Sequence, residues 1–168
     1  MIRKATQKDL IRVKKITEVC AEKMIKQNIY QWNKYYPSLH VLEKDIQEEN
    51  LLVIEIKGTV WGCIMFSEEK DPVYNTIDWL TPDNSNIYVH RLAIHPNKQG
   101  QGFGFRLMDF VEKQAANTQI ESIRLDTFSQ NPKNIKFYSK RGYKQLGDVY
   151  FVNQSPFPFH CFEKVLER

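Results

Sequence analysis

The order of apolar and polar positions divides the chain into short strands and amphipathic helices. Apolar side chains that alternate or run together predict strands, and apolar side chains three and four residues apart predict helices. By this pattern we expect strands at residues 2–5, 51–56, 59–66, 87–94, 123–127, 143–151 and 159–165. We expect helices at about residues 7–27, 39–46, 102–117 and 132–141.

Residues with known preferences for helix ends support two of these helices. Ser38 can cap the second helix, since its hydroxyl can accept a hydrogen bond from a backbone amide of the first turn. Asn131 can cap the fourth helix in the same way. Pro132 then stands at the first helical position and Gly142 follows the end, which are the places that these two residue types favour.

The order of the elements predicts a mixed β-sheet. A helix joins the strands at 87–94 and 123–127, and such a crossover connects parallel neighbours, whereas the hairpins elsewhere connect antiparallel ones. Residues 67–86 are rich in Asp, Pro and Asn and form the longest irregular stretch, in which residues 74–80 could be partly extended. The chain shows no internal repeat, linker or break in composition. We therefore expect one domain over residues 1–168, of the α/β (α+β) class, with about seven strands and about four helices.

The composition is that of a soluble globular protein. The chain has 168 residues, of which 42% are hydrophobic and 26% charged, and these values exclude disordered and fibrous classes. No apolar run approaches the roughly 20 residues of a membrane-spanning helix, and the start of the chain lacks the apolar stretch of a signal peptide. The net charge of +4 is spread along the chain. We therefore expect neither a nucleic-acid partner nor a membrane partner.

The cysteines indicate the redox environment. Cys20, Cys63 and Cys161 are widely spaced and include no CxxC pair, which fits neither a disulfide framework nor a zinc site, so we expect no metal. Each cysteine stands among apolar neighbours. This predicts buried, reduced thiols and a cytoplasmic location.

A glycine-rich segment between a predicted strand and a predicted helix has the form of an anion-binding turn. The segment is Gln99-Gly100-Gln101-Gly102-Phe103-Gly104. Glycine lets a phosphate approach the backbone closely, and the helix start presents amide N–H groups and a positive dipole end. A plain tight turn explains the same residues. The third glycine is misplaced for a Rossmann motif, and the Gly-Lys-Ser/Thr of a phosphate-loop NTPase is missing.

Two motifs follow one another along the second half of the chain. The first is Arg91-Leu92-Ala93-Ile94-His95-Pro96 followed by Gln99-x-x-Gly102-x-Gly104. The second is Asn131-x-x-Asn134-x-x-Phe137-Tyr138-x-x-x-Gly142-Tyr143. Together they resemble the two motifs of the GNAT superfamily of N-acetyltransferases, and the element order over nearly the whole chain agrees with that family. The family more often has Ala where Asn134 stands and Phe where Tyr143 stands.

The resemblance implies a binding site for acetyl-CoA. The backbones of Leu92 and Ile94 would bind the pantetheine arm, and Asn131 would contact the arm from its other side. Asn134 shares a helix face with Asn131 and Tyr138, a polar stripe that suits a ligand with amides and a sulfur. The CoA pyrophosphate would be bound by the amides of Gln99, Gly100, Gln101, Gly102, Phe103 and Gly104.

Tyr138 is the catalytic acid that the resemblance implies, because it would stand beside the thioester sulfur. A phenol of pKa about 10 is protonated at neutral pH and can donate its proton to a thiolate whose parent thiol has a pKa of about 8.5. Taken by its position alone, Tyr138 could equally be an aromatic residue of the core.

The acceptor amine must lose a proton before it can attack, so a base is also expected. Family members can carry Glu or His at the places that match Tyr88 and His90. Tyr88 is a departure, since a neutral phenol is a poor base. His90, with an unperturbed pKa of about 6.5, is therefore our candidate base, although it could instead make only a structural hydrogen bond. Asp78 and Glu163 are weaker candidates, since most carboxylates are solvated surface groups.

Aromatic residues in two loops are the candidates for the acceptor pocket. In this family the segment between the first two helices borders that pocket, which implies Gln31, Trp32 and Tyr36. Asp78 and Trp79 could face them from the long loop. Aromatic faces with a nearby carboxylate suit a cationic amine, although the same aromatics could simply pack the loops onto the domain.

We therefore expect a cytoplasmic acetyltransferase that moves acetyl directly from acetyl-CoA to a primary amine of a small molecule. A peptide or protein amine is the alternative acceptor, and a non-catalytic acyl-CoA-binding sensor on the same fold is the alternative function. Cys63 and Cys161 leave a ping-pong route through a thiol conceivable, but neither has a recognisable base partner. The sequence does not indicate the acceptor or the oligomeric state.

Overall fold

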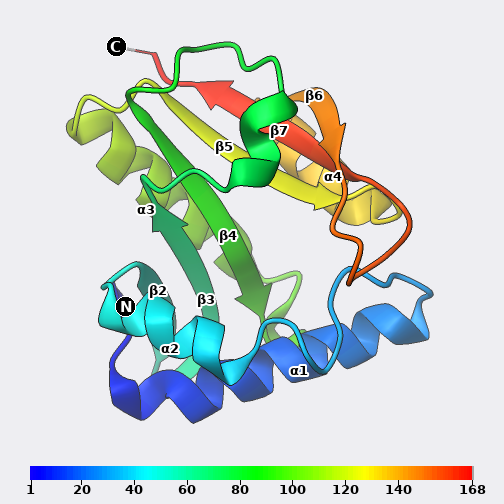
Figure 1. The fold of residues 1–168 in the computed structure, drawn as a ribbon. Helices are drawn as coiled ribbons and strands as arrows, with labels where there is room; N and C mark the ends of the chain where they lie inside the picture. Colours follow the sequence, from blue (N-terminus) through cyan, green and yellow to red (C-terminus); the bar gives the residue numbers. More distant parts are fainter. Residues whose placement is uncertain (168) are drawn as a thin grey trace. The chain divides into compact units, whose positions relative to one another are not determined.

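The strands form one hydrogen-bonded series (Figure 1). They are β1 Ile2–Lys4, β2 Leu51–Ile56, β3 Thr59–Ser67, β4 Asn86–Ile94, β5 Ser122–Phe128, β6 Lys144–Val149 and β7 Phe159–Val165. The computed structural model describes residues 1–167, and within them the strand order is β1-β2-β3-β4-β5-β7-β6. The pairs β1–β2, β2–β3, β5–β7 and β6–β7 are antiparallel, and β4 runs parallel to β5. The expected mixed sheet of seven strands is confirmed.

Two of the helices, α2 and α4, begin where their capping residues predict. Over residues 1–167 the α-helices are α1 Leu10–Lys26, α2 Leu39–Gln47, α3 Phe103–Asn117 and α4 Pro132–Lys140. Oγ of Ser38 accepts from the Val41 amide at 3.1 Å, and Oδ1 of Asn131 accepts from the Asn134 amide at 3.2 Å. Gly142 follows α4 with φ of 89°, a conformation that glycine adopts freely. In the described residues no helix is both long and apolar enough to cross a membrane.

The first compact unit consists of Met1–Phe66 and His90–Val111. Its core joins the apolar stripes of α1 and α2 to side chains of the strands, and Val13, Ile16, Leu42, Val53 and Cys63 are fully buried there. Burying one such large aliphatic side chain stabilises a fold by roughly 1.5–3 kcal/mol. The helical stripes read from the sequence are therefore core positions, as expected.

The second compact unit consists of Ser67–Val89 and residues 112–167. In this unit β7 pairs with β6, which confirms the predicted hairpin, and it also pairs with β5 along its whole length. The strand β7 thus lies between β5 and β6, an arrangement that the hairpin alone does not predict. The assignment of residues 1–168 to a single domain stays a prediction.

The loop before β4 contains a short helix where we expected partly extended backbone. A 3-10 helix covers Pro72–Thr76, and Oδ1 of Asp71 caps it by accepting from the Val73 amide at 3.0 Å. Tyr74 is therefore helical rather than extended, because the Asp-Pro pair starts a helical turn. Ile77, directly after the helix, is extended with φ of −90° and ψ of 132°.

Candidate functional site

The turn between β4 and α3 is shaped by two glycines. Gly100 and Gly102 have φ of 76° and 81°, in the left-handed region, and a Cβ on either would meet no heavy atom within 4 Å. The first helical hydrogen bond after the turn joins the Arg106 amide to the Gly102 carbonyl at 3.0 Å. The amides of the turn and of the first helical turn therefore precede the hydrogen-bonded part of α3. Such a segment favours an anion through its N–H groups and the helix dipole.

Gln99, the first residue of this turn, is held by its side chain. Its Nε2 donates to the Ile94 carbonyl at 2.9 Å, and its Oε1 accepts from Nζ of Lys23 at 2.7 Å. The turn is thereby tied to the end of β4 and to α1. Lys23 adds a positive charge beside the turn. Lys23 was not predicted from the sequence, because the helical pattern of α1 gives no sign of a contact with a residue so far along the chain.

Arg91 interrupts the regular geometry of β4. Its φ is 53°, in the left-handed region, which costs a non-glycine residue roughly 1–2 kcal/mol. Its guanidinium holds the Asp45 carboxylate with two hydrogen bonds, of 2.6 Å from Nε and 2.7 Å from Nη2, and its Nη1 donates to the Tyr36 hydroxyl at 3.1 Å. Burial opposes the charge on Arg91, but these contacts raise the pKa of Arg91 above its ordinary value. The predicted pantetheine-binding residues, Leu92 and Ile94, follow directly.

His90 precedes this irregular residue and is a weaker base than its residue type suggests. Burial first, and then the positive charge of Arg91, lower the pKa of His90 to about 4. At neutral pH the imidazole is therefore neutral and able to accept a proton, but with little affinity for it. Its catalytic role stays a prediction.

The predicted ligand face of α4 lies in the second unit. Besides capping the helix, Asn131 is buried, and Nδ2 of Asn134 donates to Oγ1 of Thr127 at 3.3 Å. Tyr138 is 6% exposed, with its ring 5.8 Å from that of Tyr143 and 6.1 Å from that of Phe162. The ring of Tyr138 thus belongs to an aromatic cluster, as the core interpretation holds. The roles of Asn131, Asn134 and Tyr138 toward a ligand stay predictions.

Asp126 on β5 is a carboxylate that sequence analysis did not single out. It is half-buried, and the Tyr74 hydroxyl donates a hydrogen bond to it. Burial first, and then the negative charge of Asp126, raise the pKa of Tyr138 above its ordinary value, so this charge acts on the predicted acid. A signal was present in the sequence. Arg124 and Asp126 are charged residues at alternate positions of an otherwise apolar strand and so point to one side of it.

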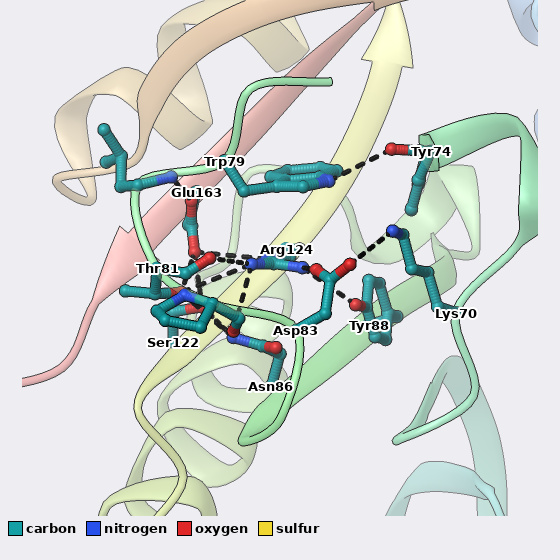
Figure 2. Close-up of polar contacts among 12 residues, drawn as sticks. Lys70, Tyr74, Trp79, Thr81, Asp83, Asn86, Tyr88, Ser122, Arg124 and Glu163 are labelled. Atoms are coloured by element: carbon teal, nitrogen blue, oxygen red, sulfur yellow. Dashed lines mark hydrogen bonds and ion pairs between the residues drawn. The ribbon is translucent and has the colours of Figure 1, made fainter. Parts of the chain in front are cut away.

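A buried arginine ties the loop before β4 to the strands of the second unit (Figure 2). Nε of Arg124 donates to Oε1 of Glu163 at 3.1 Å, and both side chains are 0% exposed. Nη1 donates to Asp83 at 2.5 Å and to the Tyr88 hydroxyl at 2.9 Å, and Nη2 donates to the Thr81 carbonyl at 2.5 Å. Glu163 also accepts from the amide of Leu80 and from the hydroxyls of Thr81 and Ser122. Glu163 and Tyr88 are therefore parts of a structural network.

Trp79, one of the predicted acceptor residues, packs against the same network (Figure 2). Its ring lies over the Arg124 guanidinium at 4.5 Å, and its indole Nε1 donates to the Tyr74 carbonyl at 3.1 Å. The rings of Tyr74 and Trp79 meet edge to face at 5.3 Å. These contacts favour packing as one role of Trp79. Asp78, its neighbour in the chain, is exposed.

The acceptor residues predicted from the segment after α1 have different environments in the first unit. Trp32 is 8% exposed and belongs to the hydrophobic core. Tyr36 is partly buried and contacts Arg91 through its hydroxyl, as described above. Gln31 is half-buried. Packing therefore explains Trp32, whereas a role of any of the three in an acceptor pocket stays a prediction.

All three cysteines are free and buried, as expected. Burial raises the pKa of Cys20 and of Cys63 to about 12, and it raises the pKa of Cys161 as well. Because the thiolate is the nucleophilic form, none of these thiols is activated at neutral pH. This disfavours a ping-pong route through Cys63 or Cys161.

Part of the chain is similar to a curated bacterial protein. The chain is 32% identical over 79 residues to a Bacillus subtilis (strain 168) protein named uncharacterized N-acetyltransferase YesJ. The alignment covers 47% of this chain and 41% of YesJ, so the chain matches less than half the length of this relative.

Solved structures share the fold at low sequence identity. A GNAT-family acetyltransferase from Streptococcus agalactiae 2603 has a TM-score of 0.83 at 21% identity, with 100% of this chain and 96% of that chain covered. YncA from Salmonella typhimurium, solved with its cofactor acetyl-CoA, has a TM-score of 0.72 at 16% identity, with 100% and 94% covered. The sequence profile of the acetyltransferase (GNAT) family matches residues 16–143, more than half of the chain. This protein therefore belongs to the acetyltransferase (GNAT) family.

Proposed function

We propose that this protein transfers an acetyl group from acetyl-CoA to a primary amine of a small molecule. The observation that carries the proposal is the turn at Gly100 and Gly102, with left-handed glycines and open space where a Cβ would stand, directly before α3. In a member of the acetyltransferase (GNAT) family, this is the anion site that the donor requires. The names of YesJ, an N-acetyltransferase, and of YncA with its cofactor acetyl-CoA support the same donor and reaction class.

The residues of the turn fit the diphosphate of acetyl-CoA. Two open glycines allow the backbone amides of residues 100–104 to approach an anion. The Gln99 amide already donates to the Pro96 carbonyl at 3.3 Å, but Lys23 places a cation beside the Gln99 side chain. Leu92 and Ile94 would bind the pantetheine arm through their backbones, and Asn131 and Asn134 would bind it through their amides. Bound acetyl-CoA supplies the thioester carbonyl that the amine attacks and the thiolate that leaves.

Tyr138 has the properties of an acid for the departing thiolate. Because burial raises the pKa of Tyr138, its hydroxyl stays protonated across the physiological range. A thiol of pKa about 8.5 is more acidic than this phenol, so transfer of the proton from Tyr138 to sulfur is unfavourable by itself and is coupled to the loss of a proton by the attacking amine. The phenolate formed at Tyr138 then recovers a proton from solvent or from the acceptor.

Asp126 is our proposed partner for the acceptor amine, and His90 is the second candidate. An alkylammonium group has a pKa of about 10.4, which is about 3.4 units above pH 7. At that pH the neutral amine, the form that can attack, is therefore disfavoured by roughly 4.6 kcal/mol relative to the charged form. A half-buried carboxylate that is oriented by the Tyr74 hydroxyl can hold the ammonium and take its proton as the carbon–nitrogen bond forms. The low pKa of His90 makes that side chain a weaker base than an ordinary imidazole.

The acceptor class rests on the environment of Asp126. A carboxylate that meets Tyr74 suits an ammonium group, since it combines charge with an aromatic neighbour. Gln31, Trp32, Tyr36, Asp78 and Trp79 are the further acceptor residues that we propose. Peptide or protein amines remain the alternative acceptors, and a cytoplasmic location is part of the proposal, in keeping with three free, buried thiols.

One experiment separates the enzyme from a non-catalytic sensor. Acetyl-CoA binding is measured by calorimetry, and thiol release is measured with a panel of small amines, lysine-containing peptides and peptide N-termini. We expect binding together with thiol release that depends on a small amine. Binding without thiol release across the panel would favour the sensor. The absence of both would refute the proposed function.

A further inference from the structure

We propose that the ion pair between Arg91 and Asp45 is a latch that holds β4 in the conformation that binds the pantetheine arm. In this role Arg91 and Asp45 are positioning residues for the donor rather than catalytic residues. The inference rests on the proposed function, because it concerns how this chain prepares Leu92 and Ile94 for acetyl-CoA.

The first observation is the backbone of Arg91. It is an arginine with φ of 53° inside a strand, a conformation that a residue with a Cβ adopts only when its surroundings impose it. The pairing of β4 with β5 covers Asn86–Tyr88 and ends before Arg91. The pairing with β5 therefore does not hold the strand after this residue, whose other hydrogen-bonded neighbour is β3.

The second observation is that the side chain of Arg91 is itself bound tightly, to the carboxylate of Asp45. The Arg91 guanidinium and the Asp45 carboxylate form two parallel hydrogen bonds, of 2.6 Å and 2.7 Å, and their side chains are 10% and 4% exposed. A two-point contact of this kind fixes direction as well as distance. Because Asp45 belongs to α2, the pair ties the irregular point of β4 to a helix of the first unit.

The third observation is that the strand after Arg91 is confined on other sides. A Cβ at Gly62 on β3 would lie 2.8 Å from the Ala93 carbonyl, and the His95 amide donates to the Trp61 carbonyl at 2.8 Å. The Ile94 carbonyl accepts from the side chain of Gln99, the first residue of the turn. The latch therefore fixes the start of the segment 92–94, and the Gln99 side chain fixes its end to the turn.

The test compares two ligands and two substitutions at one position. CoA carries the pantetheine arm, whereas ADP carries the diphosphate without it, and both affinities are measured by titration. Arg91→Ala removes the latch and keeps the cost of the left-handed conformation, whereas Arg91→Gly removes the latch and relieves that cost. We expect the Kd for CoA to rise about tenfold or more in Arg91→Ala and less in Arg91→Gly. The Kd for ADP should stay within about twofold in both.

An ordinary stabilising ion pair predicts a lower free energy of unfolding in both variants, without a loss of affinity that is specific to CoA. Equal losses for CoA and ADP, or a larger loss of CoA affinity in Arg91→Gly than in Arg91→Ala, would overturn the latch. Arg3→Ala is the matched control, because Arg3 and Asp9 form a similar two-point pair, of 2.8 Å and 3.0 Å, elsewhere in the first unit. It should leave the Kd for CoA unchanged.

Asp45→Asn, which keeps the shape of the carboxylate, serves if the Arg91 variants do not fold. In it, amide hydrogen exchange at Leu92 and Ile94 should become faster while exchange in α1 is preserved. Unchanged exchange at Leu92 and Ile94 would overturn the latch. A wild-type protein that does not bind CoA would instead refute the proposed function, so the two failures are distinguishable.

Discussion

Arg124 on β5 and Glu163 on β7 stand opposite each other in the antiparallel register and form an ion pair in which both side chains are fully buried. Around this pair, hydroxyl groups and backbone groups satisfy the remaining polar atoms of the two side chains (Figure 2). The desolvation of a buried ion pair costs free energy that offsets the attraction between its charges, so we infer that this pair serves mainly to hold other groups in place. Here those groups are residues of the loop before β4, including the segment that carries Trp79.

Removing one member of this pair should destabilise the protein strongly. Glu163→Ala leaves the Arg124 charge buried without its partner on β7, and we expect a loss of about 3–5 kcal/mol in the free energy of unfolding, measured with urea. Asp83→Ala is the control. Its side chain is 52% exposed, so its contact with Arg124 is largely screened, and we expect a loss below about 1 kcal/mol. Similar losses in both variants would contradict the account of the network.

Gly102→Ala should weaken donor binding as well as destabilise the protein, whereas the same strain elsewhere should only destabilise it. Alanine at a φ of 81° costs roughly 1–2 kcal/mol of stability, and relaxation of this strain would reshape the turn. We expect a rise of at least about tenfold in the Kd for acetyl-CoA, measured by calorimetry. Gly58→Ala is closely matched, because Gly58 has a φ of 77° and also has open space around a Cβ. It should lose comparable stability and keep the Kd; equal effects on the Kd would remove the turn from the donor site.

Local signals in the sequence were sufficient for most of the fold. The caps at Ser38 and Asn131 depend on a side chain and an amide three residues away, so the sequence alone specifies them. The glycine turn is equally local, since Gly100 and Gly102 carry their own backbone preference. The position of β7 between β5 and β6 depends on a pairing between distant segments, which a hairpin pattern does not reveal.

The environments of several polar residues could not be predicted from the sequence, because they depend on residues far along the chain. Glu163 resembles an ordinary solvated carboxylate in the sequence, and only the register of β5 and β7 brings it to Arg124. The left-handed backbone of Arg91 has no signal of its own, because arginine rarely adopts it. His90 was given an ordinary pKa, whereas its burial and its charged neighbour are properties of the fold.

Tyr138→Phe should reduce turnover while sparing donor affinity. Phenylalanine preserves the ring within the aromatic cluster with Tyr143 and Phe162 but removes the acidic hydroxyl. We expect kcat to fall by about 100-fold or more, as for other general acids, and the Kd for acetyl-CoA to change by less than about twofold. Thiol release measures the first quantity and calorimetry the second. An unchanged kcat would exclude Tyr138 as the acid.

Asp126→Asn should weaken the use of a cationic amine without affecting the donor. The substitution keeps the size of the side chain but removes the charge that holds and deprotonates the ammonium group, so we expect kcat/KM for the amine to fall by about 100-fold at pH 7. Asp148→Asn is the control, since Asp148 is an exposed carboxylate of the same unit, paired with His160. If the two variants lose activity equally, Asp126 has no special role toward the amine.

His90 should make the stability of the protein depend on pH between about 6.5 and 4. Its pKa is lowered from 6.5 to about 4 in the folded state, so in this window the unfolded chain binds a proton that the folded chain does not. Stability should therefore fall as the pH is lowered through the window, by about 3 kcal/mol in total.

Urea unfolding at several pH values measures this slope, and His90→Gln, which cannot be protonated, should reduce it. Asp9 contributes a loss in the same direction at more acidic pH, because hydrogen bonds from Arg3 lower the pKa of Asp9 to about 2. Its contribution is present above pH 3.8 and is lost as the pH falls toward 2, so it does not overlap with that of His90.

His40→Gln, at an exposed histidine of α2, serves as the control and should keep the wild-type slope. If the free energy of unfolding of His90→Gln depends on pH as strongly as that of the wild type, another group is desolvated in the folded state. His90 would then remain a candidate base of ordinary strength.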